Sequence, residues 1–131
     1  MTISYATATN NARLDAITVL ADAGATGALI LIQDGTRPAT GGTLTNTLAT
    51  LTMSVTAFTA AASGVLTANT ITVDASAALT GTATWFRLTD SAGGFVMDGE
   101  VGTDLVLSPT AGVTAANEVS ITAFTITAGN T

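Results

Sequence analysis

The hydrophobic pattern near the N-terminus is helical. Apolar side chains recur there at steps of three and four residues, at Leu14, Ile17, Leu20 and Ala21. Polar side chains fall on the opposite side, at Asp15, Thr18 and Asp22. This spacing predicts an amphipathic helix over residues 11–24, with Asn10 or Asn11 as its N-cap and Gly24 at its end. The apolar stripe is narrow, so we expect the helix to lie against a sheet. Residues 1–10 have no periodicity and are expected to form an arm or a short edge strand.

From residue 27 onward the pattern is that of strands and turns. Residues 29–32 form a continuous apolar run, typical of a strand covered on both faces, and residues 49–55 alternate apolar and hydroxyl side chains. Further strands are expected at 64–67, 70–74, 104–107 and 118–127, the last with a bulge near Ala123. About eight short strands favour an all-β fold with one short N-terminal helix. We expect a two-sheet β-sandwich of jelly-roll type over 27–127, within a single domain of residues 1–131.

A hairpin over residues 81–101 is the best-specified element. With Ala92 and Gly93 as a two-residue tip, Phe86 lies opposite Gly99 and Leu88 opposite Met97 on one face. The other face then sets Arg87 opposite Asp98 and Trp85 opposite Glu100. This register sorts apolar with apolar and also places a basic residue against an acid, and a slip of one residue would destroy both.

Composition adds that the chain has very little charge. Its 131 residues include nine Asp or Glu, three Arg, no Lys and no His, for a net charge of −6. The charged fraction of 9 % compares with roughly 25 % in ordinary domains. Thr and Ala dominate instead, with 28 and 25 copies. Most of the surface is therefore expected to be neutral.

Several classes of function are excluded by these counts. Without Lys and with a negative net charge, the chain lacks the cations that binding to nucleic acid or to an anionic membrane requires. Without Cys and His it has no zinc site of the usual kind, no thiol nucleophile and no imidazole base. The mean hydropathy is +0.55, but no 18-residue apolar run predicts a membrane span, and the first residues have no signal-peptide pattern.

Few residues offer chemistry. Asp98 and Glu100 share a strand face and Asp104 follows, which leaves a weak calcium site or an acid pair conceivable, but pairing of Asp98 with Arg87 is the favoured interpretation. The glycine-rich loop 35–42 lacks the ending of a phosphate-binding loop and is expected to be a surface connection. We expect no catalytic, metal-binding or cofactor-binding residue, and hence no enzyme.

Two side chains are candidates for contact with a partner. The planar guanidinium of Arg37 suits a partner's carboxylate. Trp85 lies on the hairpin face away from Phe86, so it is either covered by another part of the fold or exposed as a binding anchor. The alternative places Trp85 inside and Phe86 outside.

Several segments resemble one group of small phage proteins. They are Arg13-Leu14-Asp15-Ala16-Ile17, the loop 34–42, Leu48-Ala49-Thr50-Leu51, the strand 81–88, and Asp98-Gly99-Glu100-Val101-Gly102. In order and spacing they resemble the capsid cement, or decoration, proteins of tailed bacteriophages. The resemblance implies a jelly-roll homo-oligomer, a dimer or trimer, made in the host cytoplasm. It also implies a place on the outer surface of the virion head, with the major capsid protein as partner.

The expected interface includes the N-terminal arm and the Arg37 loop. Its candidate residues are Tyr5, Arg13, Arg37, Pro38 and Trp85, and Arg87 with Asp98 form a structural pair. A receptor-binding or adhesin-type module displayed on a virion or cell surface is an alternative, as is a tail structural protein. An enzyme that uses Asp98 and Glu100 is the least favoured.

Overall fold

A computed structural model describes residues 3–128 of the chain, which form one helix and ten short strands. The elements are α1 (Thr7–Ala21), β1 (Leu29–Gln33), β2 (Thr47–Met53), β3 (Val65–Thr67), β4 (Ile71–Thr72), β5 (Gly81–Thr82), β6 (Trp85–Thr89), β7 (Phe95–Glu100), β8 (Leu105–Ser108), β9 (Gly112–Val113) and β10 (Ser120–Thr127). The predicted mostly-β class with one short helix is confirmed. The residues of β5 were predicted as the start of the hairpin, but they pair with β9 instead. Strand β9 was not predicted, because two residues leave no periodic pattern.

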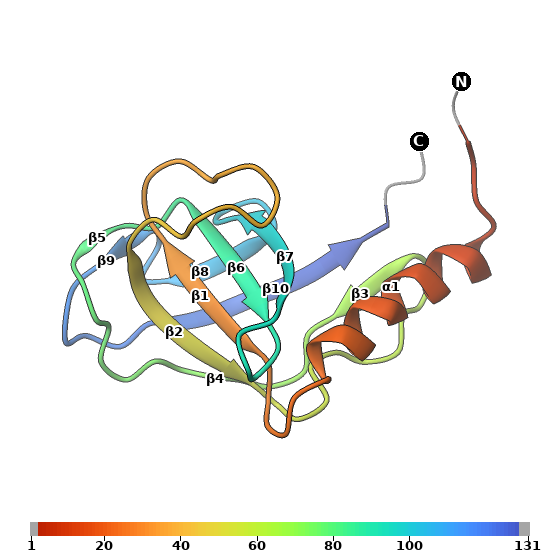
Figure 1. Ribbon diagram of the computed structural model, residues 1–131, viewed down its shortest axis with the longest axis horizontal. Coiled ribbons are helices and arrows are strands. Elements are labelled where there is room, and N and C mark those ends of the chain that lie inside the picture. The colour runs from red at the N-terminus through yellow and green to blue at the C-terminus, as the bar shows by residue number, and fades with distance from the viewer. Residues whose placement is uncertain (1–2, 129–131) are drawn as a thin grey trace.

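The strands form three antiparallel sheets (Figure 1). The largest has the order β4-β2-β1-β6-β7, a second has the order β3-β10-β8, and β5 pairs with β9. Strand β1 lies at the centre of the largest sheet, which explains its continuous apolar run. Helix α1 lies beside β3, on the flank of the molecule (Figure 1).

Aromatic side chains join the two larger sheets. The ring of Phe124 in β10 meets Phe86 of β6 edge-on, with 5.3 Å between centroids, and meets Phe58 at 5.5 Å. The Phe86 ring also lies against Gly99 of β7, where a Cβ atom would come within 2.5 Å of the ring. The predicted bulge in the last strand is confirmed by a register shift between Ile121 and Ala123.

The hairpin has the predicted register but not the predicted tip. Arg87 lies opposite Asp98 and Phe86 opposite Gly99, as expected, and the register then shifts by one after Leu88. The turn spans residues 90–94, where Gly93 has a φ of +90° and its N–H donates to the Asp90 carbonyl. The two-residue tip was therefore wrong, because a type I′ tip needs a positive φ at both residues and Ala92, unlike Gly93, does not have one.

The helix begins earlier than predicted. Residues 7–10, assigned to the arm, are helical, and the N-cap is Ala6, which makes no side-chain capping bond. The predicted caps lie inside the helix: Asn10 is buried, and Asn11 Oδ1 accepts a hydrogen bond from the N–H of Gly64 at 2.9 Å. Neither asparagine caps the helix, because Asn10 accepts a hydrogen bond from Arg13 within the helix and Asn11 serves the tertiary contact to Gly64. Residues 1 and 2 of the predicted arm lie outside the described residues.

Candidate interaction surfaces

The acidic side chains are engaged within the fold. Six of the seven aspartates accept hydrogen bonds from backbone N–H groups: Asp15, Asp22, Asp34, Asp74, Asp90 and Asp104. The seventh, Asp98, pairs with Arg87. Each carboxylate thus satisfies groups of its own chain that would otherwise lose hydrogen bonds on folding.

The pair of Arg87 and Asp98 is bidentate and confirms the predicted hairpin pair. Arg87 Nε donates to Asp98 Oδ1 at 2.7 Å and Nη2 donates to Oδ2 at 2.9 Å. The two side chains are only 9 % and 7 % exposed. The hydrogen bond to Asp98 raises the pKa of the Arg87 guanidinium above its ordinary value, although burial opposes this shift. The guanidinium also lies over the rings of Trp85 and Phe95, at 5.5 and 5.0 Å.

Trp85 is not an exposed anchor. It is 1 % exposed, and its Nε1–H donates to the carbonyl of Asp34 at 2.9 Å and to Thr45 Oγ1 at 3.1 Å. Both acceptors belong to the loop between β1 and β2, which therefore folds over this face of the sheet. The neighbouring Phe86 is buried in the core on the other face. Trp85 as an interface residue was thus wrong, and so was the alternative with Phe86 outside. The Trp85 ring is buried and its N–H already has hydrogen-bond acceptors in the chain, so the side chain stabilises the fold and is not available to a partner.

The Arg37 loop borders an open hollow. Arg37 Nη2 lies 3.7 Å from Glu100 Oε1, and both side chains are largely exposed, so this ion pair is weak. Between the loop and β7 is a hollow of about 440 Å³, lined by residues 37–40 and 95–98. The loop thus brings Arg37 and Pro38 next to the exposed ring of Phe95.

Helix α1 turns its polar side inward. Asn11, Asp15 and Asp22 accept hydrogen bonds from the backbone N–H groups of Gly64, Ala61 and Ala57. Thr18 lies on the same side, and its hydroxyl is buried without a hydrogen-bond partner among the described residues. Segment 57–64 has no regular strand to satisfy these amides, so the helix supplies the acceptors. The expectation that this side faces away from the fold was therefore wrong.

The outer side of the helix is apolar and exposed. Leu14 and Ala21 of the predicted stripe are buried in the core and Ile17 packs against it, as expected. Leu20, expected in the same stripe, is 57 % exposed, and its neighbour Val19 is 71 % exposed. Ala8, Ala12 and Ala16 are also exposed and precede them on the helix. The sequence held a signal that we missed. Val19 and Leu20 are adjacent, so they project about 100° apart on a helix, too far apart for one narrow stripe.

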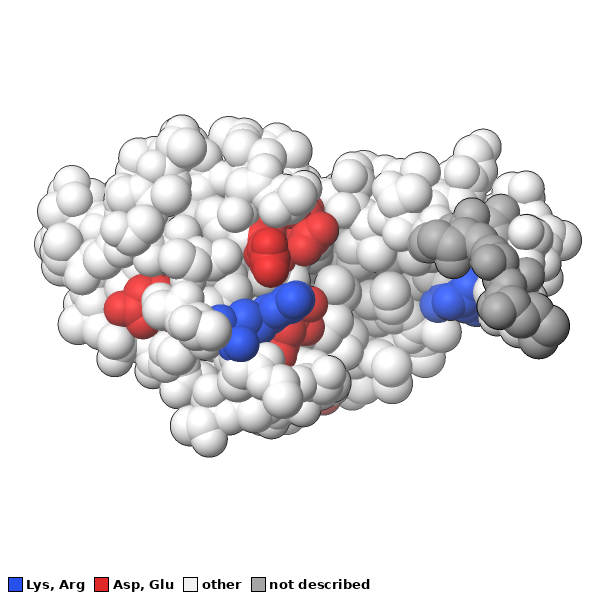
Figure 2. All heavy atoms as spheres, turned by 90° about the horizontal axis from the view of Figure 1, so that it is seen from above, with Lys and Arg blue, Asp and Glu red and all other residues white. Residues whose placement is uncertain are grey.

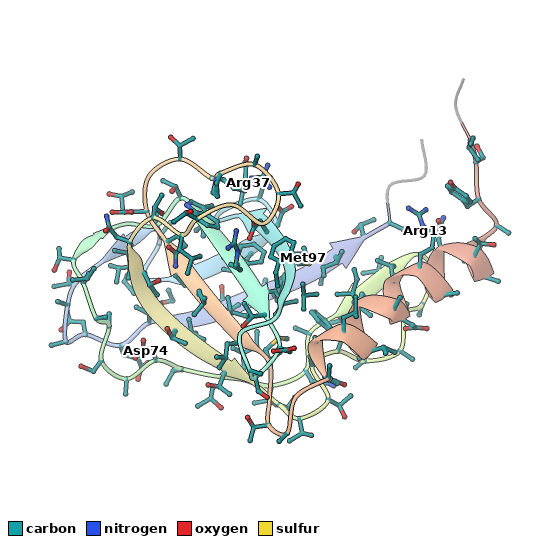
Figure 3. The ribbon with its side chains drawn as sticks, in the orientation of Figure 1. Arg13, Arg37, Asp74 and Met97 are labelled. Atoms are coloured by element: carbon teal, nitrogen blue, oxygen red, sulfur yellow. The ribbon has the colours of Figure 1, made fainter. Side chains whose placement is uncertain are left out.

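The predicted interface residues form two separate groups. Tyr5 lies against Arg13, whose guanidinium carbon is 4.6 Å from the ring centroid and whose Nη1 donates to Asn10 Oδ1 at 3.3 Å. Figure 3 places Arg13 on the helix and Arg37 on the far side of β7, so the arm and the Arg37 loop do not form one surface. Phe95 and Val19 are exposed residues that the sequence did not single out, and Leu20 is exposed where burial was expected.

No cluster that suggests metal chemistry occurs in the described part of the chain. No group of three or more His, Cys, Asp or Glu side chains there is placed to hold a metal ion. Residues 3–128 also contain no helix with the length and apolar character needed to cross a bilayer. Comparison of the chain with protein-family models, curated proteins and solved structures found no match.

Proposed function

We propose that this chain is a structural virion protein, a cement or decoration protein that binds the outside of the major capsid protein shell and stabilises the head. It is made in the host cytoplasm and acts on the outer surface of the virion, and no catalytic activity is part of the proposal. Its two larger sheets would form a jelly-roll type sandwich. The pairing of β1 with β6 and of β3 with β10 fits such a fold, since Greek-key connections bring together strands distant in sequence. The resemblance of residues 13–102 to phage cement proteins supports the same role.

The observation that carries the proposal is the internal use of the charged groups. Because all seven aspartates bind amides or Arg87, the exposed surface consists mainly of Thr, Ala and other neutral side chains. Such a surface loses little solvation when another protein covers it. An oligomer that is bound to the capsid lattice at several points dissociates far more slowly than a protein that is held by one such contact.

The outer face of α1 supports self-association. Its N-terminal half carries the small residues Ala8, Ala12 and Ala16, and its C-terminal half carries Val19 and Leu20. A two-fold axis through the helix centre sets two copies antiparallel, which places the bulky half of each against the small half of the other. No acidic side chain lies on this face, because those of the helix point inward. The proposed oligomer is therefore built around an α1 pair.

The decisive experiment locates the chain in purified virions. Heads and tails are separated and the chain is quantified in each by mass spectrometry, and heads with and without it are heated to compare their stability. We expect the chain on heads, removable by mild denaturant, with less stable heads after its removal. A chain found only on tails would make it a tail structural protein. A chain absent from virions would overturn the proposal, and glycan or cell binding would then favour the displayed binding module.

The oligomer has its own test with a matched control. Val19 in α1 is 71 % exposed and Val55, in the loop after β2, is 70 % exposed. We expect Val19→Lys to shift the purified chain toward the monomer in sedimentation, and Val55→Lys to leave the oligomer intact. Both positions are exposed, and Lys is a good helix former at position 19, so the fold is retained in both variants. If both variants sediment like the unmodified chain, the helix pair is excluded.

A further inference from the structure

Strand β7 is an outer strand of the largest sheet, and part of its backbone faces outward. Within residues 3–128 it pairs with β6 alone. The N–H of Val101 donates inward to the Thr84 carbonyl, whereas the N–H of Glu100 points the other way and donates to Asp104 Oδ2. Because backbone direction alternates along a strand, Asp98 also directs its N–H and carbonyl outward. The Asp98 side chain is 7 % exposed while the residue as a whole is half-buried, so its exposed surface is mainly backbone.

A hollow flanks this edge on each face of the sheet. One is the hollow of about 440 Å³ under the Arg37 loop, beside Phe95. The other, of about 230 Å³, is lined by Met97, Thr103 and Asp104 together with residues 125–127 of β10. Met97 borders both hollows, and Figure 3 shows it between the Arg37 loop and β10. An added strand directs its side chains alternately to the two faces, so both hollows would receive them.

The charges near the edge select the partner. Four acidic side chains lie on or beside β7, namely Asp90, Asp98, Glu100 and Asp104, against the two basic side chains Arg37 and Arg87. Figure 2 shows acidic and basic side chains close together near the middle of one face of the molecule. A second copy would bring the same excess of acid to the contact and would be repelled. A basic segment would be attracted, and because this chain has no Lys and only three Arg, that segment belongs to a different protein.

We propose that the edge of β7 at Asp98 binds an extended, positively charged segment of a different protein as an added strand. Its apolar side chains contact Phe95 and Pro38 on one face, and its Lys or Arg side chains face Asp104 on the other. Backbone hydrogen bonds to Asp98 set its register. The identity of that protein as the major capsid protein rests on the proposed function, but the strand addition itself does not.

The test uses a synthetic peptide, Thr-Val-Lys-Val-Lys-Val-Thr, capped at both ends, and NMR of the full chain. We expect saturable shifts of the Asp98 amide and its protection from hydrogen exchange. N-methylation of the valines and N-methylation of the lysines are compared, because only one of these two sets of amides can face β7. One methylated peptide should lose binding and the other should retain it. No saturable shift at peptide concentrations up to roughly 1 mM, or equal binding of both methylated peptides, would overturn the proposal.

Two controls examine the charge. A peptide with Glu in place of both Lys should bind more weakly than the lysine peptide. Asp104→Asn keeps an acceptor for the Glu100 N–H and removes one charge, so the affinity for the lysine peptide should fall by roughly three-fold. Glu118→Gln also removes one negative charge, from an exposed loop before β10, and should leave the affinity for the lysine peptide unchanged. Equal effects of the two variants would contradict a local role of Asp104.

The outcome is separable from that of the proposed function. Peptide binding by a chain that is absent from virions would leave the strand addition standing without the capsid role. Conversely, if the Asp98 amide exchanges equally fast in free and head-bound protein, the edge is not the contact, although the chain still binds heads.

Discussion

The carboxylate of Asp15 in α1 accepts a hydrogen bond of 2.7 Å from the backbone N–H of Ala61, 46 residues further along the chain. Asn11 and Asp22 make the same kind of contact one turn before it and two turns after it. The helix is therefore attached to segment 57–64 through its polar side. This attachment leaves Val19 and Leu20 on the outside.

Replacement of Asp15 tests this attachment. Asp15→Ala leaves the Ala61 N–H without its acceptor in a part-buried site, so we expect a loss of about 1–3 kcal/mol in the free energy of unfolding. Asp15→Asn keeps an acceptor oxygen, so its free energy of unfolding should fall less than that of Asp15→Ala. Denaturant unfolding measures both, with the exposed Glu118→Ala as the reference. If Asp15→Ala and Glu118→Ala cost the same, the hydrogen bond contributes nothing.

Thr18 offers a stabilising change. Its hydroxyl is buried between the contacts of Asp15 and Asp22 and makes no hydrogen bond among the described residues. Thr18→Val has nearly the same shape and removes this unsatisfied group, so we expect a gain of about 1 kcal/mol in the free energy of unfolding. Thr9→Val, at an exposed position of the same helix, is the control for the change in helix propensity. If thermal unfolding shows Thr18→Val to be less stable than Thr9→Val, the buried Thr18 hydroxyl does not destabilise the fold.

Removal of only one member of the Arg87–Asp98 pair is expected to lower the free energy of unfolding. Arg87→Met leaves the Asp98 carboxylate unpaired and mostly buried, so we expect a loss of about 3 kcal/mol or more. The double variant Arg87→Met with Asp98→Leu removes both charges and should be more stable than either single variant. A double-mutant cycle in denaturant measures the coupling. Strict additivity would mean that the two groups do not depend on each other.

Trp85→Phe tests how the Arg37 loop is held in place. The change retains most of the buried ring and removes the Nε1–H that binds Asp34 and Thr45, so about 1–2 kcal/mol should be lost. Hydrogen exchange should become faster in the loop between β1 and β2 and stay unchanged in β10. Faster exchange throughout the chain would instead indicate a general loss of stability.

The hairpin shows how much local pattern determines. The register of β6 and β7 followed from the sequence because two independent signals, apolar pairing and the Arg87–Asp98 pair, agree only in one alignment. The mostly-β class, the single helix and the bulge near Ala123 followed from periodicity in the same way.

The orientation of the helix was decided by tertiary structure. Leu14 and Ala21 of the apolar stripe meet the core, as the sequence predicted. A period of 3.6 residues shows that α1 has two unlike sides, but not that the polar side also meets the fold. That choice depends on the unpaired amides of segment 57–64, which the helix sequence does not contain. The burial of Trp85 was likewise set by the loop that covers it. The sequence determined the elements and their pairing because those signals are local. Only the tertiary structure decided which surfaces stay exposed, because exposure depends on what other segments cover.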